Sequence, residues 1–169
     1  MTELYFCRIE SSAPSAGSEA AHRLLEEAAS RRWPELPKPL PLEEDEKGKP
    51  YIRGYPGCQF SLSHSGGWAA CALSDGPVGV DIQQHREIPA LVSRKFSGEE
   101  QEWLRNHPDS FFDLWVKKEA YLKALGAGLT IRLDRFTVLP LENNMVAGCR
   151  IWLADPPEKG YSCAICETG

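Results

Sequence analysis

The sequence lacks long apolar runs, a secretion signal and an excess of positive charge. Its longest apolar run, WAACAL, is the length of a strand, whereas a membrane span needs about 18 consecutive apolar residues. The amino terminus, MTELYFCRIESS, alternates charged and apolar residues in place of the basic start and apolar stretch of a signal peptide. We therefore expect a cytoplasmic protein with no membrane partner.

The charge balance argues against nucleic acid as a partner. Lys and Arg total 19 against 24 Asp and Glu, which gives a formal net charge of −5 at pH 7. Proteins that bind a nucleic-acid duplex through a broad face carry an excess of Lys and Arg there.

Size and cysteine content fit a reduced globular domain. A chain of 169 residues, 42% of them hydrophobic, can bury a core without disulfides or a structural metal. We expect its six cysteines to be reduced and buried. Cys163 and Cys166 form a CxxC, which zinc and redox sites also use. An offset of three in a strand points the thiols to opposite faces, which favours two core residues.

The first half predicts one helix and one hairpin. We expect a strand over residues 4–9, a helix from an N-cap at Ser18 to about Trp33, and an extended, proline-rich connector over 34–50. A proline-rich ligand for a partner is the alternative use of that connector. Two apolar runs, CQFSLSHS and WAACALS, flank Gly66-Gly67 and predict a β-hairpin.

The second half begins with GPVGVDIQ, a predicted strand that places Val78, Val80 and Ile82 on one face. We then expect a helix over 88–96, a second helix from the capping box at Ser97 through Leu104, and a third from about 109 to Gly126 or Gly128. Three strands are predicted near 136–139, 149–153 and 161–166.

A weak internal echo suggests two similar halves. GWAACAL and GYSCAIC each follow a turn and combine an aromatic residue with small residues and cysteine. We expect one domain over 1–169 with pseudo-symmetric halves at about 1–76 and 77–169, because neither half alone would bury enough surface for comfortable stability.

The helix over 111–126 carries the most informative charged residues. Lys118 falls within its apolar stripe, so its ammonium must either extend to solvent or be held by an anion. Glu119 and Lys123 lie one turn apart at the margin of the stripe, which is also the spacing of an ordinary surface ion pair.

Other polar residues have two interpretations each. Asp81 and Gln83 share a strand face and could offer oxygen ligands to a hard cation such as Mg²⁺, or simply be solvated. His64 alternates with apolar residues as a core histidine would, yet it stands beside Ser63 at the hairpin mouth, where donors could hold a phosphate. Lys49, followed by Pro50, would by default be an exposed lysine of a loop.

Together these segments resemble one family. GKP at 48–50, FSLSHS at 60–65, GVDIQ at 79–83 and WVKKEAYLKALGAGL at 115–129 are similar, in order and approximate spacing, to the Sfp-type 4′-phosphopantetheinyl transferases. AAHRLLEEA at 20–28 also resembles the first helix of that family.

The resemblance implies a fold and an activity. The fold is α+β, with two pseudo-symmetric halves, each a small mainly antiparallel sheet packed with helices, and an active site between them. The activity is Mg²⁺-dependent transfer of the 4′-phosphopantetheine arm of coenzyme A to a serine of an acyl or peptidyl carrier protein. The family's two-lobed class implies a monomer.

The resemblance also implies roles for individual residues. Glu119 and Lys123 would be catalytic, and Asp81, Glu119 and Gln83 would face the metal. Coenzyme A would be bound by a set of residues from four segments: Arg23, Lys49, Pro50, Ser63, His64, Lys118 and Lys123. Arg86, Arg94 and Lys95 are the densest basic cluster near this site and would face an acidic carrier protein.

Two departures from the family pattern leave an alternative open. Gln83 stands where members commonly carry a second acid, and few residues separate the first strand from the first helix. The competing hypothesis is a non-catalytic module of the same fold that binds coenzyme A or a carrier protein. A structural protein with an accidental set of motifs is the third.

Overall fold

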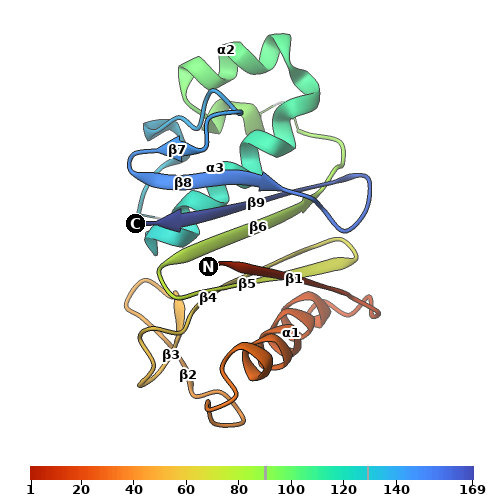
Figure 1. Ribbon diagram of the computed structural model, residues 1–169. Coiled ribbons are helices and arrows are strands. Elements are labelled where there is room, and N and C mark those ends of the chain that lie inside the picture. The colour runs from red at the N-terminus through yellow and green to blue at the C-terminus, as the bar shows by residue number, and fades with distance from the viewer. Residues whose placement is uncertain (90, 129) are drawn as a thin grey trace.

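A computed structural model describes residues 1–89, 91–128 and 130–169 (Figure 1). The helices are α1 (Ala16–Arg32), α2 (Gly98–Asn106) and α3 (Phe111–Leu125). The strands are β1 (Glu3–Arg8), β2 (Leu42–Glu44), β3 (Pro50–Ile52), β4 (Gln59–Ser65), β5 (Trp68–Ser74), β6 (Val78–Gln84), β7 (Met145–Val146), β8 (Cys149–Ala154) and β9 (Tyr161–Thr168).

Within the described residues, the strands form two main antiparallel sheets and one small hairpin. The first sheet has the order β1-β5-β4, the second has the order β6-β9-β8-β7, and β2 pairs with β3. Figure 1 shows α1 against the first sheet and α3 against the second. The predicted α+β class, with small sheets packed with helices, is confirmed.

The two sheets repeat one topology. A strand, a helix and a hairpin follow each other as β1, α1, β4 and β5 in the first half, and as β6, α3, β8 and β9 in the second. In both sheets the last strand of the unit lies between the other two. The echo between GWAACAL and GYSCAIC therefore marks the two equivalent central strands, β5 and β9.

A shared core joins the halves. Ala70 and Ala72 of β5 pack in one buried cluster with Val78, Val80 and Ile82 of β6, as the alternation of GPVGVDIQ predicts. Tyr161, Cys163 and Ile165 of β9 complete the same cluster. Because this cluster draws on both sheets, it is buried only where the two halves pack against each other.

Three serines of β4, which we call the serine ladder, join the sheets where strand pairing stops. Ser61, Ser63 and Ser65 each accept, through Oγ, a backbone N–H of β6. The donors are Val80 at 3.0 Å, Ile82 at 3.2 Å and Gln84 at 3.0 Å. Two edge strands are thus held side by side through hydroxyl groups.

Two predictions for the first half are wrong. Helix α1 begins at Ala16 with Ser15, not Ser18, as its N-cap, and the Ser15 hydroxyl donates to the Glu19 carboxylate at 2.6 Å. The connector over 34–50 is not wholly irregular, because it contains β2 and reaches β3. A turn held by the Asp45 side chain, which accepts N–H groups of two following residues, lets these short strands pair.

Two predictions for the second half are also wrong. Over 88–96, which includes Ala90 outside the described residues, the structure has a 3-10 turn at Val92–Lys95 in place of the predicted helix; Pro89 interrupts the pattern. The apolar run at 136–139 is not a strand, because the Val138 N–H bonds to Glu100 Oε1 at 3.0 Å. The capping box at Ser97 and the start of α2 are as predicted.

The CxxC residues face different cores. Cys163 belongs to the cluster between the sheets and Cys166 to the cluster under α3, as the strand offset predicts. Burial raises the pKa of both thiols to about 12, which is typical of inert core cysteines. Within the described part of the chain, no helix combines the length and apolarity needed to cross a bilayer.

Candidate active site

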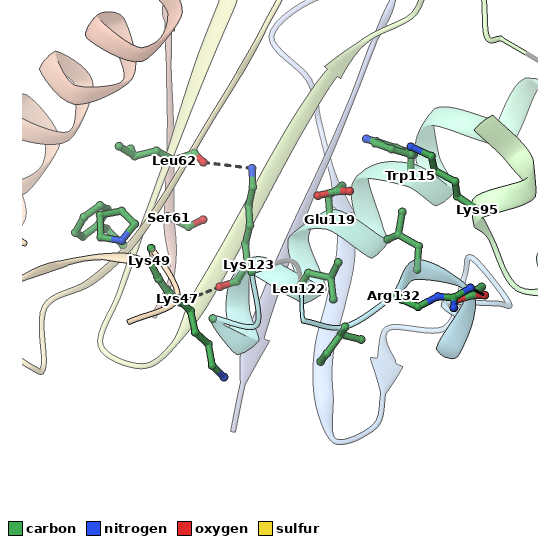
Figure 2. A pocket seen from close by; sticks show the side chains of 18 of the residues that line it. Lys47, Lys49, Ser61, Leu62, Lys95, Trp115, Glu119, Leu122, Lys123 and Arg132 are labelled. Carbon is green, nitrogen blue, oxygen red and sulfur yellow. Dashed lines mark hydrogen bonds and ion pairs between the residues drawn. The ribbon is translucent and has the colours of Figure 1, made fainter. Parts of the chain in front are cut away.

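A cavity of about 770 Å³ opens between the β2–β3 hairpin, β4 and α3. Figure 2 shows Glu119 and Lys123 projecting into this cleft from α3, with Trp115 and Lys95 toward one end. Apolar side chains, including Phe60, Leu62, Trp115, Leu122, Ile131 and Leu133, line much of it. Positive charge comes from Lys47, Lys49, Arg94, Lys95, Lys123 and Arg132. The cleft therefore combines an apolar wall with an excess of cations.

Gly79 sets the distance between β6 and α3. A methyl group at this position would lie 2.0 Å from the carbonyl oxygen of Ala120 and 2.5 Å from the Ala124 nitrogen. Only glycine permits this approach, in which strand backbone and helix backbone touch. Two residues further along the strand, Asp81 is consequently brought to the turn of α3 that carries Lys123.

Asp81 is buried, and its two carboxylate oxygens differ. Oδ1 accepts the Ser63 hydroxyl at 3.0 Å and the Lys123 ammonium at 2.8 Å. Oδ2 is buried without any hydrogen-bond partner among the described residues. Because a buried, unpaired carboxylate oxygen is costly, Oδ2 needs a ligand, and a cation is the kind that a carboxylate prefers.

Glu119 provides a second carboxylate at this site. Burial, followed by the negative charge of Asp81, raises the pKa of the Glu119 carboxyl. Lys123 and Lys95 act in the opposite direction. Two carboxylates that repel each other in a partly buried cleft favour a divalent cation between them.

The donor set fits magnesium. Among the described residues no group of three or more His, Cys, Asp or Glu could enclose a metal by itself. Mg²⁺ usually takes one or two protein carboxylates and completes its shell with water and substrate phosphates, so Asp81 and Glu119 suffice. Gln83, half-buried two residues after Asp81, lies on the same strand face.

Lys123 is held against β4 and β6 by its hydrogen bonds. Its ammonium donates to Asp81 Oδ1 at 2.8 Å, to the Val80 carbonyl at 3.0 Å and to the Leu62 carbonyl at 3.3 Å. The side chain is 32% exposed and lines the cavity. Lys123 therefore places a positive charge beside the carboxylate pair and within reach of an anionic ligand.

Lys49 and Pro50 line the same cavity, but the Lys49 ammonium is already bonded to protein. It donates to the carbonyls of Lys123 at 2.8 Å and Ala124 at 3.4 Å. Burial lowers the pKa of Lys49. The predicted nucleotide-binding segment thus lies at the cleft, with its lysine directed at the end of α3.

Lys118 does not reach the cleft, contrary to the prediction. Its side chain is fully buried, and its ammonium bonds to Glu100 Oε2 at 2.6 Å and to the Phe136 carbonyl at 2.6 Å. The rings of Phe136 and Phe96 flank it, at 4.1 and 5.6 Å from their centroids. Of the two alternatives for Lys118, the anion is present, but it is a protein carboxylate.

Like Lys118, five further predicted residues are not among the residues that line the cavity: Arg23, Ser63, His64, Asp81 and Gln83. His64 is exposed, with its ring against the first turn of α1, where a methyl group on Gly17 would be 2.4 Å from Nδ1. Arg23 lies on the exposed face of α1 beside Glu19, Glu26 and Glu27. Ser63 is buried against Asp81. Leu129, the last residue of the quoted motif, lies outside the described residues.

Sequence reasoning missed several residues that shape the site. Trp115 and Arg132 line the cavity, and Glu100 is the anion that holds Lys118. Glu100 was predicted solely as a capping-box residue, a role that it also fills. A lysine inside an apolar stripe was the signal that a buried acid must exist, but it could not indicate which one.

Comparisons with known proteins identify relatives of this chain. The sequence profile of the 4′-phosphopantetheinyl transferase superfamily matches residues 77–166. A 4′-phosphopantetheinyl transferase of Bacillus subtilis is 32% identical over 88% of this chain and 75% of its own length. The transferase Sfp of Bacillus subtilis strain 168 is 31% identical over the same shares.

The similarity extends beyond bacteria. The human L-aminoadipate-semialdehyde dehydrogenase-phosphopantetheinyl transferase is 30% identical over 90% of this chain and 56% of its own length. These relatives are transferases by name, and the matched region contains β6 and α3, the two elements that carry Asp81, Glu119 and Lys123. The chain belongs to the 4′-phosphopantetheinyl transferase superfamily.

Proposed function

We propose that this protein transfers the 4′-phosphopantetheine arm of coenzyme A to a serine of an apo carrier protein, with Mg²⁺, and releases adenosine 3′,5′-bisphosphate. The observation that supports it most is the unpartnered Oδ2 of Asp81, whose carboxylate lies beside Glu119 and Lys123, two residues that line the cation-rich cleft. A protein that merely bound its ligand would not need two carboxylates where phosphates enter. That the protein acts as a monomer stays a prediction.

Asp81 and Glu119 would hold the magnesium ion. Bound there, the ion would neutralise charge on the pyrophosphate of coenzyme A. Ser63 would keep the Asp81 carboxylate oriented by donating to Oδ1, while Oδ2 has no hydrogen-bond partner among the described residues. Gln83 would contribute a neutral carbonyl oxygen or face a water molecule.

Glu119 would act as the general base. It would accept the proton of the carrier serine as the serine oxygen forms a bond to the phosphorus that bears the pantetheine arm. The bond from this phosphorus to the oxygen of the adenosine-side phosphate breaks, and that oxygen leaves with the electron pair. The Lys123 ammonium, next to the carboxylates, would stabilise or protonate the departing group.

The decisive experiment measures product mass. The protein is incubated with coenzyme A, Mg²⁺ and several apo carrier proteins, and the carriers are examined by intact mass spectrometry. We expect one phosphopantetheine arm to be added to at least one carrier, and to be absent without Mg²⁺. No gain of mass on any carrier, together with measurable coenzyme A binding, would establish the non-catalytic module that Gln83 leaves open.

The cytoplasmic location stays a prediction.

Gln83→Glu is expected to strengthen Mg²⁺ binding. A third carboxylate on the Asp81 face adds one negative charge near the cation, so the Mg²⁺ concentration for half-maximal rate should fall by about tenfold. The rate at saturating Mg²⁺ should change little. Gln84→Glu, on the opposite strand face, adds the same charge as a control. An identical Mg²⁺ titration for wild type and Gln83→Glu would show that residue 83 does not face the metal.

Charge reversal at Arg94 and Lys95 is expected to weaken carrier recognition. Both side chains are exposed at the rim of the cavity, where an acidic carrier would dock. Arg94→Glu with Lys95→Glu should raise the KM for the carrier by about tenfold at low salt, and less at high salt. The KM for coenzyme A of the same variant, and a variant with Arg31→Glu and Lys38→Glu, provide the controls. A carrier KM that stays constant would count against this docking face.

The pH dependence should reveal the raised pKa of Glu119. A general base must be deprotonated, and burial raises the pKa of this carboxyl. At limiting Mg²⁺ the rate should therefore fall on acidification at a pH above the ordinary pKa of glutamate. More Mg²⁺ favours the charged carboxylate and should move this limb to lower pH. If the acidic limb of the pH–rate profile does not shift with the Mg²⁺ concentration, Glu119 is not a ligand of the metal.

A further inference from the structure

Lys49 connects the two walls of the cleft. Its backbone belongs to the turn that leads into β3, and its ammonium donates to the carbonyls of Lys123 and Ala124 at the carboxyl end of α3. In Figure 2 this contact runs from Lys49, on the hairpin side of the cavity, to the helix that carries Glu119. A single side chain thus links a short hairpin to the helix with the proposed catalytic groups.

The turn that carries Lys49 is held in a defined shape. Asp45 Oδ1 accepts the backbone N–H groups of Lys47 and Lys49, each at 2.9 Å. The Asp45 N–H donates to the Lys49 carbonyl, and the Gly48 N–H donates to the Asp45 carbonyl, both at 2.9 Å. These bonds therefore fix the backbone of the turn from which the Lys49 side chain extends.

The acceptors of Lys49 are groups that need a cation. The last carbonyls of an α-helix have no intrahelical partner and lie at the negative end of the helix dipole. The Lys49 ammonium brings a charged donor to two of these carbonyls, and that of Lys123 also accepts the Gly126 N–H at 3.1 Å. Gly126, which ends the helix, would place a methyl group 3.2 Å from Lys49 Cδ, so glycine keeps the path of the side chain open.

The contact between the Lys49 side chain and the end of α3, which we call the bridge, also lies between two cavities. Besides the cleft of about 770 Å³, a second cavity of about 610 Å³ lies on the other side of the hairpin turn. The residues that line both are Lys47, Lys49, Pro50, Phe60 and Gly126. Since the wall between the cavities contains the Lys49 side chain, its loss would leave the hairpin free to move relative to α3.

We propose that Lys49 is a positioning residue, which sets the width of the coenzyme A cleft by tying the β2–β3 hairpin to the end of α3. This inference rests on the proposed transferase function. Lys49 contacts Lys123 through its backbone carbonyl, while the side chains of Asp81 and Lys123 are held by each other and by β6. Its loss should therefore affect the binding of coenzyme A more than the chemical step.

The kinetic test compares Lys49→Met with Lys47→Met. Both remove one positive charge from the same turn, but only the first removes the bonds to the helix. For Lys49→Met we expect the KM for coenzyme A to rise by about tenfold more than for Lys47→Met, the size of one lost charge-assisted hydrogen bond. The kcat and the KM for the carrier should stay within about twofold of wild type. General destabilisation would instead lower the fraction of folded, active enzyme and therefore the apparent kcat.

Hydrogen exchange without coenzyme A tests the bridge itself. In Lys49→Met, peptides covering 45–52 and 121–128 should exchange faster than in wild type, and those in β9 should not change. A lysine that merely contacted a phosphate would leave the ligand-free exchange unaltered. Unchanged exchange, or a coenzyme A KM equal to that of Lys47→Met, overturns the proposal.

The exchange comparison also separates this inference from the proposed function. It needs no substrate, so it decides whether the bridge exists even if the wild-type protein transfers nothing. If Lys49→Met fails to fold, Lys49→Gln, which keeps a shorter neutral donor, should show the same changes to a smaller extent.

Discussion

Glu119→Gln should abolish phosphopantetheine transfer while leaving the fold intact. The substitution keeps the shape of the side chain but removes both the proton acceptor and one charge of the carboxylate pair. General-base catalysis alone contributes about 10²- to 10⁴-fold, and loss of a metal ligand adds to this. We therefore expect kcat to fall by at least about 10³-fold in a carrier-modification assay.

Two comparisons make the Glu119 result specific. Glu102→Gln removes an exposed carboxylate from α2 and should keep wild-type turnover. Glu119→Gln itself should retain wild-type thermal unfolding, because neutralising a carboxyl whose pKa is raised by burial does not destabilise the native state. Unchanged turnover in Glu119→Gln would remove this residue from the mechanism.

Lys118→Met should destabilise the protein more than any substitution at the cleft. Lys118 and Glu100 are both fully buried, with Lys118 Nζ 2.6 Å from Glu100 Oε2. The Glu100 carboxylate also accepts the N–H groups of Ser97 and Val138. Removing the cation leaves this carboxylate buried without a counter-charge, which costs about 3–5 kcal/mol. Urea unfolding followed by circular dichroism measures the loss.

A double-mutant cycle separates the ion pair from simple packing. Glu100→Gln removes the charge that Lys118→Met leaves behind, so the double variant should be more stable than Lys118→Met alone. If Glu100→Gln lowers the free energy of unfolding by the same amount in wild type and in Lys118→Met, the two side chains are not coupled. Lys123→Met, a partly exposed lysine on the same helix, should cost less stability than Lys118→Met.

The sequence predicted α3 and its chemistry well because both depend on local spacing. The stripe of α3, the alternation of β6 and the turn at Gly66 are set by residues near each other in the chain, and Gly66 adopts the positive φ that the hairpin needs. Asp81, Glu119 and Lys123 could be assigned to one site because the motifs that contain them resemble those of a family. Their roles remain proposals.

Partners distant in the chain could not be predicted. Lys118 required an anion, but the choice of Glu100 depends on how α2 packs against α3. Lys49 was assigned to the nucleotide from a motif, and its bond to α3 spans 74 residues of sequence. The run at 136–139 has the composition of a strand, yet the Val138 N–H is taken by a buried carboxylate from α2. In each case tertiary contacts override a local pattern.

The serine ladder makes the seam between the sheets specific in register. Backbone pairing would let an unpaired edge accept almost any strand, including one from another molecule. The hydroxyl groups of Ser61, Ser63 and Ser65 instead accept alternate N–H groups of the β6 edge, and Ser63 also donates to Asp81, a contact that depends on the register. A slip by two residues would pair Ser63 with Val80 or Gln84 and carry Asp81 away from Lys123. The same three side chains therefore protect the protein from edge-to-edge aggregation and align its two halves into one site.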